Sequence, residues 1–400
     1  MMQKFIEAGY EIVDFEDKAD VYIINTCTVT NMADKKSRQM IRRVKELNEE
    51  SVLVAVGCYA QVAKDDLSKI EEIDLILGVN EKNNIVNYVE EYMKNRNKKI
   101  DISDLKYDTQ FVDFGSITYT EKTRAVIKVQ DGCNQFCSYC IIPYARGRVR
   151  SRNKESILKE ITEIAKKDIK EVVITGIHIA SYGKDFKEEY KLIDLLEDIN
   201  KIDGIERIRL GSLEPTIITE DFVKRLSKLE KICDHFHLSL QSGCDETLKR
   251  MNRKYTTEEF RIVVKLLRKY FENVLLTTDI IVGFPGETEE EFEKTYNFLD
   301  EIKFYKMHVF KYSPRKGTVA AKMKEQIDGN IKEERSKKLI EMSNKNEAEY
   351  NNTYIGKKVK VLFEEREGEY MKGHTTNYIM VKEKTEENLE NKIVEVEFKF

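Results

Sequence analysis

The stretch AVIKVQDGCNQFCSYC, residues 125–140, decides the fold because it joins a short apolar run to three closely spaced cysteines. The run AVIKV has the length and β-branched content of a buried strand. Six such strands, alternating with helix-like segments, predict a partial (β/α)6 barrel, open on one side, with its functional groups at the carboxyl ends of the strands. The five later runs are EVVITG (171–176), RIRLG (207–211), HFHLSL (235–240), VLLTTDIIVG (274–283) and KMHVF (306–310).

The segments on either side of this core predict two further domains. Upstream, the apolar runs VYIIN, VLVAV and LILG alternate with helix-like segments, which predicts a parallel α/β domain over residues 1–96. The polar stretch 96–123 predicts an irregular connection, and we assign the core to residues 120–350. Residues 351–400 contain short alternating strands and predict a small β-barrel. The predicted fold class is therefore α/β with three domains.

Composition limits the classes of partner. The chain has 68 Lys and Arg against 72 Asp and Glu, so its formal charge of −4 predicts no overall attraction to nucleic acid, and an RNA surface must be a local patch. The first residues, MMQKFIEAGYEIVDF, show no basic segment followed by a long apolar run, and no later stretch has about 18 consecutive apolar residues, so we expect a cytoplasmic protein with no membrane partner. In a reducing compartment, seven cysteines with three of them crowded together favour metal binding over disulfides.

The three crowded cysteines, Cys133, Cys137 and Cys140, predict a 4Fe–4S cluster. Three thiolates on one loop can bind three irons of a cubane and leave the fourth iron open. An open iron can bind S-adenosyl-L-methionine, and an electron passed through the cluster can cleave it to a 5′-deoxyadenosyl radical. A zinc knot is the alternative, but zinc normally takes four ligands and no nearby Cys or His supplies the fourth. The spacing Cys-x3-Cys-x2-Cys resembles the signature of the radical S-adenosylmethionine superfamily.

Residues at the other strand ends are candidates for binding the nucleoside part of this cofactor. Glycine lets the backbone approach a ligand, and Ser and Gln offer hydrogen bonds. The segment GFPGE (283–287) also suits a turn at the start of a helix, and we expect both roles. The superfamily resemblance implies that the aromatic residue before the last cluster cysteine packs on adenine. The candidates are Tyr139, Gly176, Ser239, Gln241 and Gly283.

Two more cysteines, Cys27 and Cys58, follow the apolar runs of the first domain. Both are predicted to lie at the carboxyl edge of one parallel sheet, where α/β proteins gather their sites. From the residues alone, buried core cysteines are the commoner explanation. The remaining cysteines, Cys233 and Cys244, are expected to be packed in the interior.

Long motifs across the chain resemble the methylthiotransferase family. They are NTCTVTNMADKKSRQ, VGCYAQ, DGCNQFCSYCIIPYARGRVRSR, TGIHIASYG, RLGSLEP, FHLSLQSGCDETLKRMNRKYT, TDIIVGFPGETEEEF and FKYSPRKGTVAA. The versions TGIHIASYG and YARGRVRSR resemble the branch that modifies N6-threonylcarbamoyladenosine at tRNA position 37. The resemblance implies a second 4Fe–4S cluster, held by Cys27, Cys58 and a third cysteine from an opening strand. This sequence begins inside the following helix, so the third cysteine has no counterpart, and we expect a start that has been placed too late.

The resemblance implies a transferase that uses S-adenosylmethionine twice, once to methylate a cluster-bound sulfur and once to make the radical that activates carbon 2 of adenine. It also implies a flavodoxin or ferredoxin as electron donor, and it likens the last domain to the RNA-binding TRAM module. Three alternatives remain: methylthiolation of isopentenyladenosine in tRNA, methylthiolation of a ribosomal-protein aspartate, and a catalytically incomplete tRNA-binding protein.

Two sets of cations are candidates for contacting the tRNA anticodon loop. Arg146, Arg148, Arg150 and Arg152 alternate after the cysteine loop and, if extended, would form one phosphate-facing row. A second basic helix face is formed by Lys35, Arg38 and Arg42. We assign no general acid or base, and His178, His235, His237 and His308 are expected to be core histidines.

Overall fold

The computed structural model describes residues 1–28, 31–105, 110–113, 115 and 123–399. Two compact units can be recognised, and three segments form each of them. The first unit consists of Met1–Tyr119, Gly132–Arg150 and Ser313–Lys322. The second consists of Thr120–Asp131, Ser151–Tyr312 and Met323–Phe400. The cysteine loop at 133–140 therefore belongs to the first unit, together with the amino-terminal sheet. The predictions that fall on residues 29–30, 106–109, 114, 116–122 and 400 lie outside the described residues.

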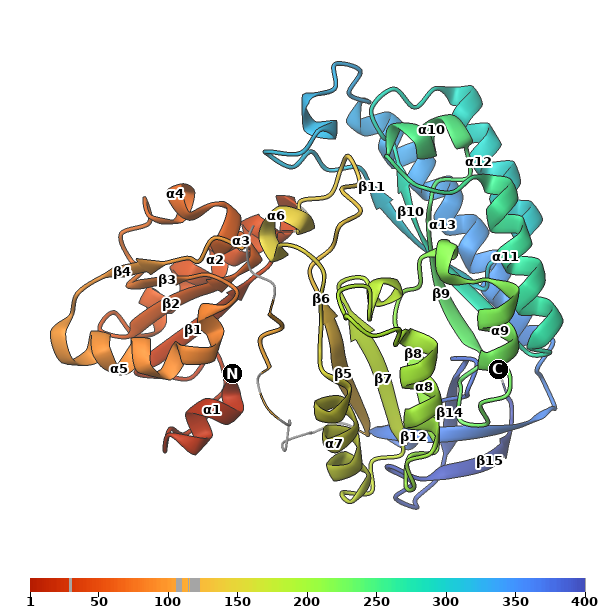
Figure 1. Ribbon diagram of the computed structural model, residues 1–400, viewed down its shortest axis with the longest axis horizontal. Coiled ribbons are helices and arrows are strands. Elements are labelled where there is room, and N and C mark those ends of the chain that lie inside the picture. Colours follow the sequence, from red (N-terminus) through yellow and green to blue (C-terminus); the bar gives the residue numbers. More distant parts are fainter. Residues whose placement is uncertain (29–30, 106–109, 114, 116–122, 400) are drawn as a thin grey trace. The chain divides into compact units, whose positions relative to one another are not determined.

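The first unit is built on a parallel sheet with the strand order β1-β2-β3-β4 (Figure 1). The strand β2 is buried along its whole length, which explains the unbroken apolar run VLVAV. One face of the sheet packs against α2 and the other against α5. The strands are β1 Val21–Thr26, β2 Val52–Gly57, β3 Leu75–Leu77 and β4 Lys99–Asp101. The helices are α1 Met2–Glu7, α2 Asn31–Leu47, α3 Cys58–Val62, α4 Lys64–Leu67, α5 Ile85–Asn95 and α6 Ile142–Arg146, with short 3-10 turns at Glu81–Asn84 and Ala320–Lys322.

The strand β4 corrects the prediction that 96–123 is an irregular connection. It pairs in parallel with β3, and its Asp101 accepts a hydrogen bond from the Tyr88 hydroxyl at 2.7 Å. A three-residue strand at the edge of a sheet is held mainly by backbone hydrogen bonds, so the apolar run that marks β2 is absent from it.

The second unit contains the predicted partial barrel. Six strands lie in two parallel sheets, and the bridges Ile208↔Ile232 and Leu213↔Leu238 connect these sheets. Each of the six predicted runs forms a strand, which confirms the predicted fold class. The strands are β5 Arg124–Asp131, β7 Glu171–Gly176, β8 Arg207–Leu210, β9 His235–Gln241, β10 Leu275–Val282 and β11 Lys306–Lys311, and β6 Arg150–Ser151 pairs beside β5.

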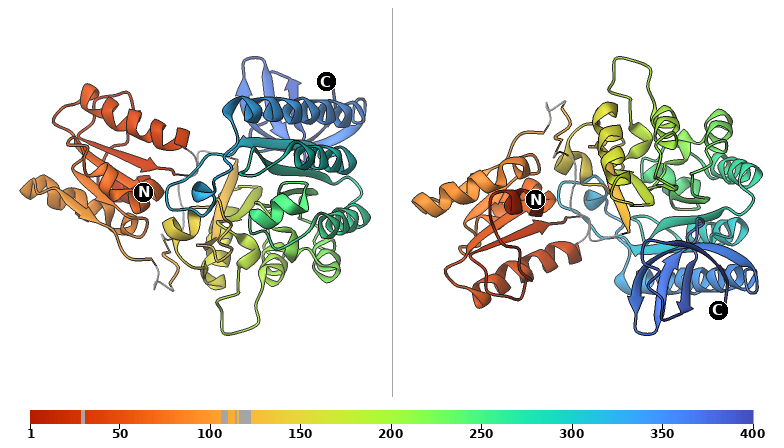
Figure 2. Two further views of the ribbon diagram at one scale, coloured as in Figure 1. Left: turned by 90° about the horizontal axis from the view of Figure 1, so that it is seen from above. Right: turned by 90° about the horizontal axis from the view of Figure 1, so that it is seen from below.

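Helices cover the outside of the barrel strands and share one large apolar core with them. Side-chain caps set several helix starts; Thr256 and Glu259 form a reciprocal capping box, as do Thr288 and Glu291. The long helix α13 lies along β11 (Figure 2). The helices are α7 Lys154–Ala165, α8 Leu192–Asn200, α9 Glu220–Leu226, α10 Asp245–Arg250, α11 Thr257–Tyr270, α12 Glu289–Ile302 and α13 Gly329–Asn352, with 3-10 turns at Ile179–Ser181 and Pro215–Ile217.

A curled antiparallel sheet, ordered β14-β13-β12-β15, completes the second unit and confirms the predicted carboxy-terminal strands. Two arginines of β8 form hydrogen bonds between the barrel and this antiparallel sheet. Arg207 donates to the carbonyl of His374 at 2.9 Å, and Arg209 donates to that of Thr376 at 2.9 Å while it pairs with buried Glu171. The strands are β12 Lys358–Glu367, β13 Tyr370–His374, β14 Met380–Lys384 and β15 Ile393–Glu397.

Candidate functional site

The three-cysteine loop of the first unit has a backbone fixed at both of its ends. The Cys133 amide donates to the carbonyl of Gly147 at 3.1 Å, and the Cys140 amide donates to that of Cys137 at 2.9 Å. Gly132 has φ +71°, and an added Cβ would lie 1.8 Å from the Arg148 carbonyl oxygen, so only glycine fits there. The start of the loop is therefore in close contact with residues 147–148, which follow the loop in the chain.

The three thiols of this loop are accessible from its surface to different degrees. Cys133 is 9% exposed, and Cys137 and Cys140 are half-buried, so all three lie near the surface of a tight loop. Across the part of the chain that the structure describes, no three His, Cys, Asp or Glu side chains converge as ligands of one ion. A cubane binds each thiolate through a different iron, so it does not need that convergence.

Cys27 and Cys58 lie side by side at one edge of the first sheet, as predicted. The strands β1 and β2 pair in parallel, and Thr26 is the register partner of Gly57. Each cysteine is the next residue after its member of this pair. Cys27 is exposed, and Cys58, the first residue of α3, is 9% exposed. The parallel register therefore places the two cysteines at neighbouring positions on this edge of the sheet.

Arg146 connects this pair with the segment that follows the three-cysteine loop. Its Nε donates to the Cys58 Sγ at 3.1 Å. Arg146 is the last residue of α6, which contacts α3 within the same unit. A guanidinium that donates to a thiolate stabilises the anionic sulfur. No sequence pattern predicts this contact, because the two residues are 88 positions apart.

The predicted row of four arginines is wrong. Arg150 is 1% exposed and donates to the Arg146 carbonyl at 2.8 Å, and Arg152, which is 4% exposed, pairs with Glu160. Only Arg148 is exposed, and its guanidinium lies 4.9 Å from the centre of the Phe136 ring. The alternation fails because Arg146 ends a helix and β6 is only two residues long, so no extended stretch turns the four side chains to one side.

In the second unit, the predicted cofactor-binding residues lie at the carboxyl ends of the barrel strands. Gly176 ends β7, Ser239 and Gln241 lie at the end of β9, and Gly283 follows β10, which pairs with β9. The side chains of Ser239 and Gln241 have no hydrogen-bond partner among the described residues. Tyr139 is half-buried and belongs to the first unit.

The GFPGE segment forms the expected turn at the start of a helix. The backbone amides of Gly283 and Phe284 donate to the Glu287 carboxylate at 3.1 and 3.4 Å. Arg335 of α13 pairs with Glu287 at 2.7 Å, so this buried carboxylate is satisfied from two sides. The turn therefore presents the Gly283 backbone at the end of β10 just before α12.

His178, His235 and His237 are at least partly buried and the two remaining cysteines are buried, as predicted, whereas the prediction is wrong for His308, which is exposed on β11. His178 bonds Ser181 at 2.8 Å and Glu214 at 2.6 Å through its two ring nitrogens. His235, His237 and His308 lie toward the amino ends of their strands, away from the predicted cofactor residues. Cys233 is 2% exposed, and burial raises the pKa of its thiol to about 12. Cys244 is 1% exposed, and burial also raises its thiol pKa.

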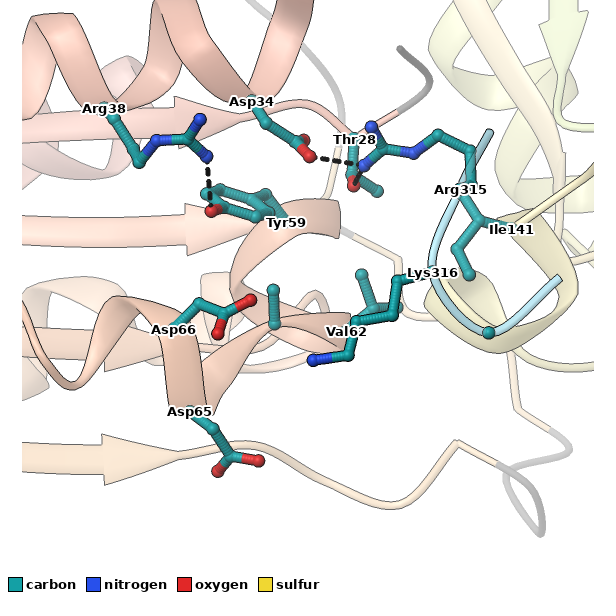
Figure 3. A pocket seen from close by; sticks show the side chains of 12 residues that line it. Thr28, Asp34, Arg38, Tyr59, Val62, Asp65, Asp66, Ile141, Arg315 and Lys316 are labelled. Carbon is teal, nitrogen blue, oxygen red and sulfur yellow. Dashed lines mark hydrogen bonds and ion pairs between the residues drawn. The ribbon is translucent and has the colours of Figure 1, made fainter. Parts of the chain in front are cut away.

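A pocket of about 430 Å³ in the first unit was not foreseen (Figure 3). Arg315 enters it from the segment 313–322 and pairs with Asp34 of α2, and it also donates to the Thr28 hydroxyl. Arg38 donates to the Tyr59 hydroxyl at 2.8 Å across the pocket. Asp34 and Arg315 are 281 positions apart, so only the folded chain reveals their pairing.

A parallel partial barrel whose first strand leads into a three-cysteine loop defines a radical S-adenosylmethionine protein. Residues 127–299 match the model of the Radical SAM superfamily, and residues 1–78 match uncharacterized protein family UPF0004. Among solved structures, the radical S-adenosylmethionine methyltransferase TsrM of Kitasatospora setae has a TM-score of 0.56 at 16% identity, over 74% of this chain and 63% of that one. Another structure of TsrM, at the same TM-score and identity, holds cobalamin and a [4Fe-4S] cluster.

Relatives of known sequence identify the family within this superfamily to which the chain belongs. The chain is 42% identical to the threonylcarbamoyladenosine tRNA methylthiotransferase MtaB of Bacillus subtilis (strain 168), over 98% of this chain and 88% of that protein. MtaB of Aquifex aeolicus (strain VF5) is 43% identical over 96% of this chain and 92% of that protein. The tRNA-2-methylthio-N(6)-dimethylallyladenosine synthase of Alkaliphilus oremlandii (strain OhILAs) is 37% identical over 97% and 84%. The chain belongs to the radical S-adenosylmethionine tRNA methylthiotransferases.

Proposed function

We propose that this chain transfers a methylthio group to carbon 2 of N6-threonylcarbamoyladenosine at position 37 of tRNA. The observation that carries the proposal is the agreement between near full-length similarity to MtaB and the placement of five cysteines. Three of them share one loop and two share one sheet edge, all within a single compact unit. A methylthiotransferase of this class needs two iron–sulfur clusters, and these two sets supply thiols for both.

Each set has its own role in the mechanism. A 4Fe–4S cluster with an open iron supplies, when bound, the electron that cleaves S-adenosylmethionine to a carbon radical. Cys133, Cys137 and Cys140 would hold that cluster. Cys27 and Cys58 would hold the cluster that carries the transferred sulfur, and the Arg146 guanidinium, which donates to Cys58, lowers the electron density on that thiolate.

Residues of the second unit would bind the cofactor. The side chains of Ser239 and Gln241 are available to hydrogen-bond ribose or adenine, and the Gly283 backbone can approach the ligand closely. The contact of Tyr139, a residue of the first unit, with adenine stays a prediction from the superfamily resemblance. Because carbon 2 of adenine is not acidic, abstraction of its hydrogen by a radical replaces proton removal, and no histidine is required as a base.

The partners follow from the same proposal. The substrate is the tRNA anticodon loop, and a flavodoxin or ferredoxin in the cytoplasm would supply electrons. Lys35 and Arg42 are exposed on α2 and available to phosphates, whereas Arg38 is turned toward Tyr59. None of the described helices is long and apolar enough to cross a membrane.

Nucleoside analysis in cells tests the proposal. The gene is expressed in a bacterium whose own threonylcarbamoyladenosine methylthiotransferase has been deleted, and digested tRNA is analysed by mass spectrometry. The proposal expects the methylthio derivative of threonylcarbamoyladenosine to return, with isopentenyladenosine unchanged. Methylthiolated isopentenyladenosine alone, or a methylthiolated ribosomal protein, would assign the chain to one of the alternatives.

A further inference from the structure

The pocket of the first unit abuts both sets of cysteines. Three of its lining residues directly follow a predicted iron ligand: Thr28 follows Cys27, Tyr59 follows Cys58 and Ile141 follows Cys140. All twelve lining residues belong to this one unit. A group bound in the pocket therefore lies within a few residues of the thiols that would hold each cluster.

Two cations of the pocket lack a carboxylate partner among the described residues. Arg38 donates to the Tyr59 hydroxyl and forms no ion pair there, and exposed Lys316 forms neither a hydrogen bond nor an ion pair. By contrast, Arg315 is neutralised by Asp34. Asp65 and Asp66 lie at the exposed rim, where water screens their charges. Arg38, beside the Tyr59 ring, and Lys316, on the exposed side, are therefore two positive groups that the pocket can offer to an anion (Figure 3).

The pocket also offers a buried acceptor. Asp34 is 8% exposed; its Oδ2 accepts from Arg315, while its Oδ1 is buried without a hydrogen-bond partner in the described structure. A buried polar atom without a partner is costly, so this oxygen favours a ligand that brings an N–H or O–H group. The ligand that suits the pocket thus combines an anionic group with a hydrogen-bond donor.

We propose that this pocket binds the threonylcarbamoyl side chain of the substrate nucleoside, a step that rests on the proposed function. That side chain carries a carboxylate for Arg38 and Lys316, and it carries a hydroxyl and ureido N–H groups that can donate to Asp34 Oδ1. An isopentenyl group is a hydrocarbon and would leave all three protein groups unpaired. Sites built on hydrogen bonds reject analogues that lack the matching group, so the pocket selects the anionic nucleoside.

Equilibrium binding tests the pocket separately from turnover. The reconstituted full chain is titrated with anticodon stem-loops that differ only at position 37, which carries threonylcarbamoyladenosine, isopentenyladenosine or adenosine. The quantity of interest is the ratio of Kd for adenosine to Kd for threonylcarbamoyladenosine. Removing a charged hydrogen bond in Arg38→Gln or Lys316→Gln should lower that ratio about tenfold. Lys36→Gln is the matched control, because it removes one exposed charge from the same helix outside the pocket.

The outcomes separate the two proposals. A lower ratio in Arg38→Gln and Lys316→Gln, with the ratio unchanged in Lys36→Gln, supports the pocket. If both pocket variants keep the wild-type ratio while the wild-type chain still forms the methylthio product, the pocket assignment fails and the proposed function stands. If the wild-type chain binds the three stem-loops equally and forms no product, the proposed function fails as well. Circular dichroism of each variant checks that the first unit remains folded.

Discussion

The five cysteines of the first unit and the two of the second lie in different surroundings. Cys27 is exposed at a strand end and Cys137 lies on a loop, whereas Cys233 and Cys244 are buried in the second unit. Burial raises the pKa of both enclosed thiols, so they stay protonated and are poor ligands at neutral pH. The five cysteines of the first unit are thus the ones that we propose as metal ligands.

The largest effect is expected at the three-cysteine loop. Cys137→Ala removes one of three thiolates and should abolish reductive cleavage of S-adenosylmethionine, because the cluster that delivers the electron no longer assembles. Formation of 5′-deoxyadenosine, measured by chromatography with dithionite as reductant, reports the loss. Cys244→Ala is the control and should cleave normally. Normal cleavage by Cys137→Ala would overturn the assignment of the loop.

A substitution in the second cysteine set, Cys27 and Cys58, should abolish methylthio transfer and leave the cleavage of S-adenosylmethionine intact. Cys58→Ala should still form 5′-deoxyadenosine but should make no methylthio product, since only the cluster at the sheet edge is affected. After anaerobic reconstitution, this variant should contain about four fewer irons per chain than a chain with both clusters, because one cubane holds four irons. Loss of cleavage in this variant would mean that the two sets do not act independently.

The thiols themselves should react differently. In the chain without clusters at pH 8, iodoacetamide should modify Cys27 within minutes and leave Cys233 unmodified, because a thiol with a pKa of about 12 is almost entirely protonated and is also enclosed. Peptide mass spectrometry after a time course gives both rates, and denatured chain should show all seven cysteines modified. Equal rates for Cys27 and Cys233 in the folded chain would remove the contrast between the units.

The contact between Arg146 and Cys58 predicts the smallest change. Loss of a charged hydrogen bond to a cluster thiolate in Arg146→Met should lower the midpoint potential of that cluster by roughly 60 mV or more, because the reduced, more negative cluster loses the stabilisation that the guanidinium gives it. A redox titration followed by electron paramagnetic resonance measures this potential. Arg146→Lys keeps the charge and should show a smaller shift, and equal potentials in all three proteins would rule out the contact in the loaded enzyme.

Much of the fold could be predicted because its strands are marked by local patterns in the sequence. Each barrel strand is an apolar run with turn residues at its end, and Cys27 and Cys58 follow runs of the same kind. β4 was missed because a short edge strand has no apolar signature. The predicted row of arginines was wrong because it required an extended strand. Arg146 instead ends a helix, and Arg150 and Arg152 are buried.

The contacts that complete the site could not be predicted, for a different physical reason. The pairs Arg146–Cys58 and Asp34–Arg315 join residues that lie far apart in the chain, and no property of either partner specifies the other. Asp34 and Arg38 lie one turn apart on α2, so both could be placed on a helix face. The loop that covers that face could only be identified from the folded structure.

The most direct test of the central claim is a reaction with purified components. The reconstituted chain receives S-adenosylmethionine with a deuterated methyl group, a reductant and a stem-loop containing threonylcarbamoyladenosine. The account predicts a nucleoside that carries the deuterated methylthio group on carbon 2, detected by mass spectrometry. Recovery of unmodified threonylcarbamoyladenosine, despite full iron loading and release of 5′-deoxyadenosine, would contradict it.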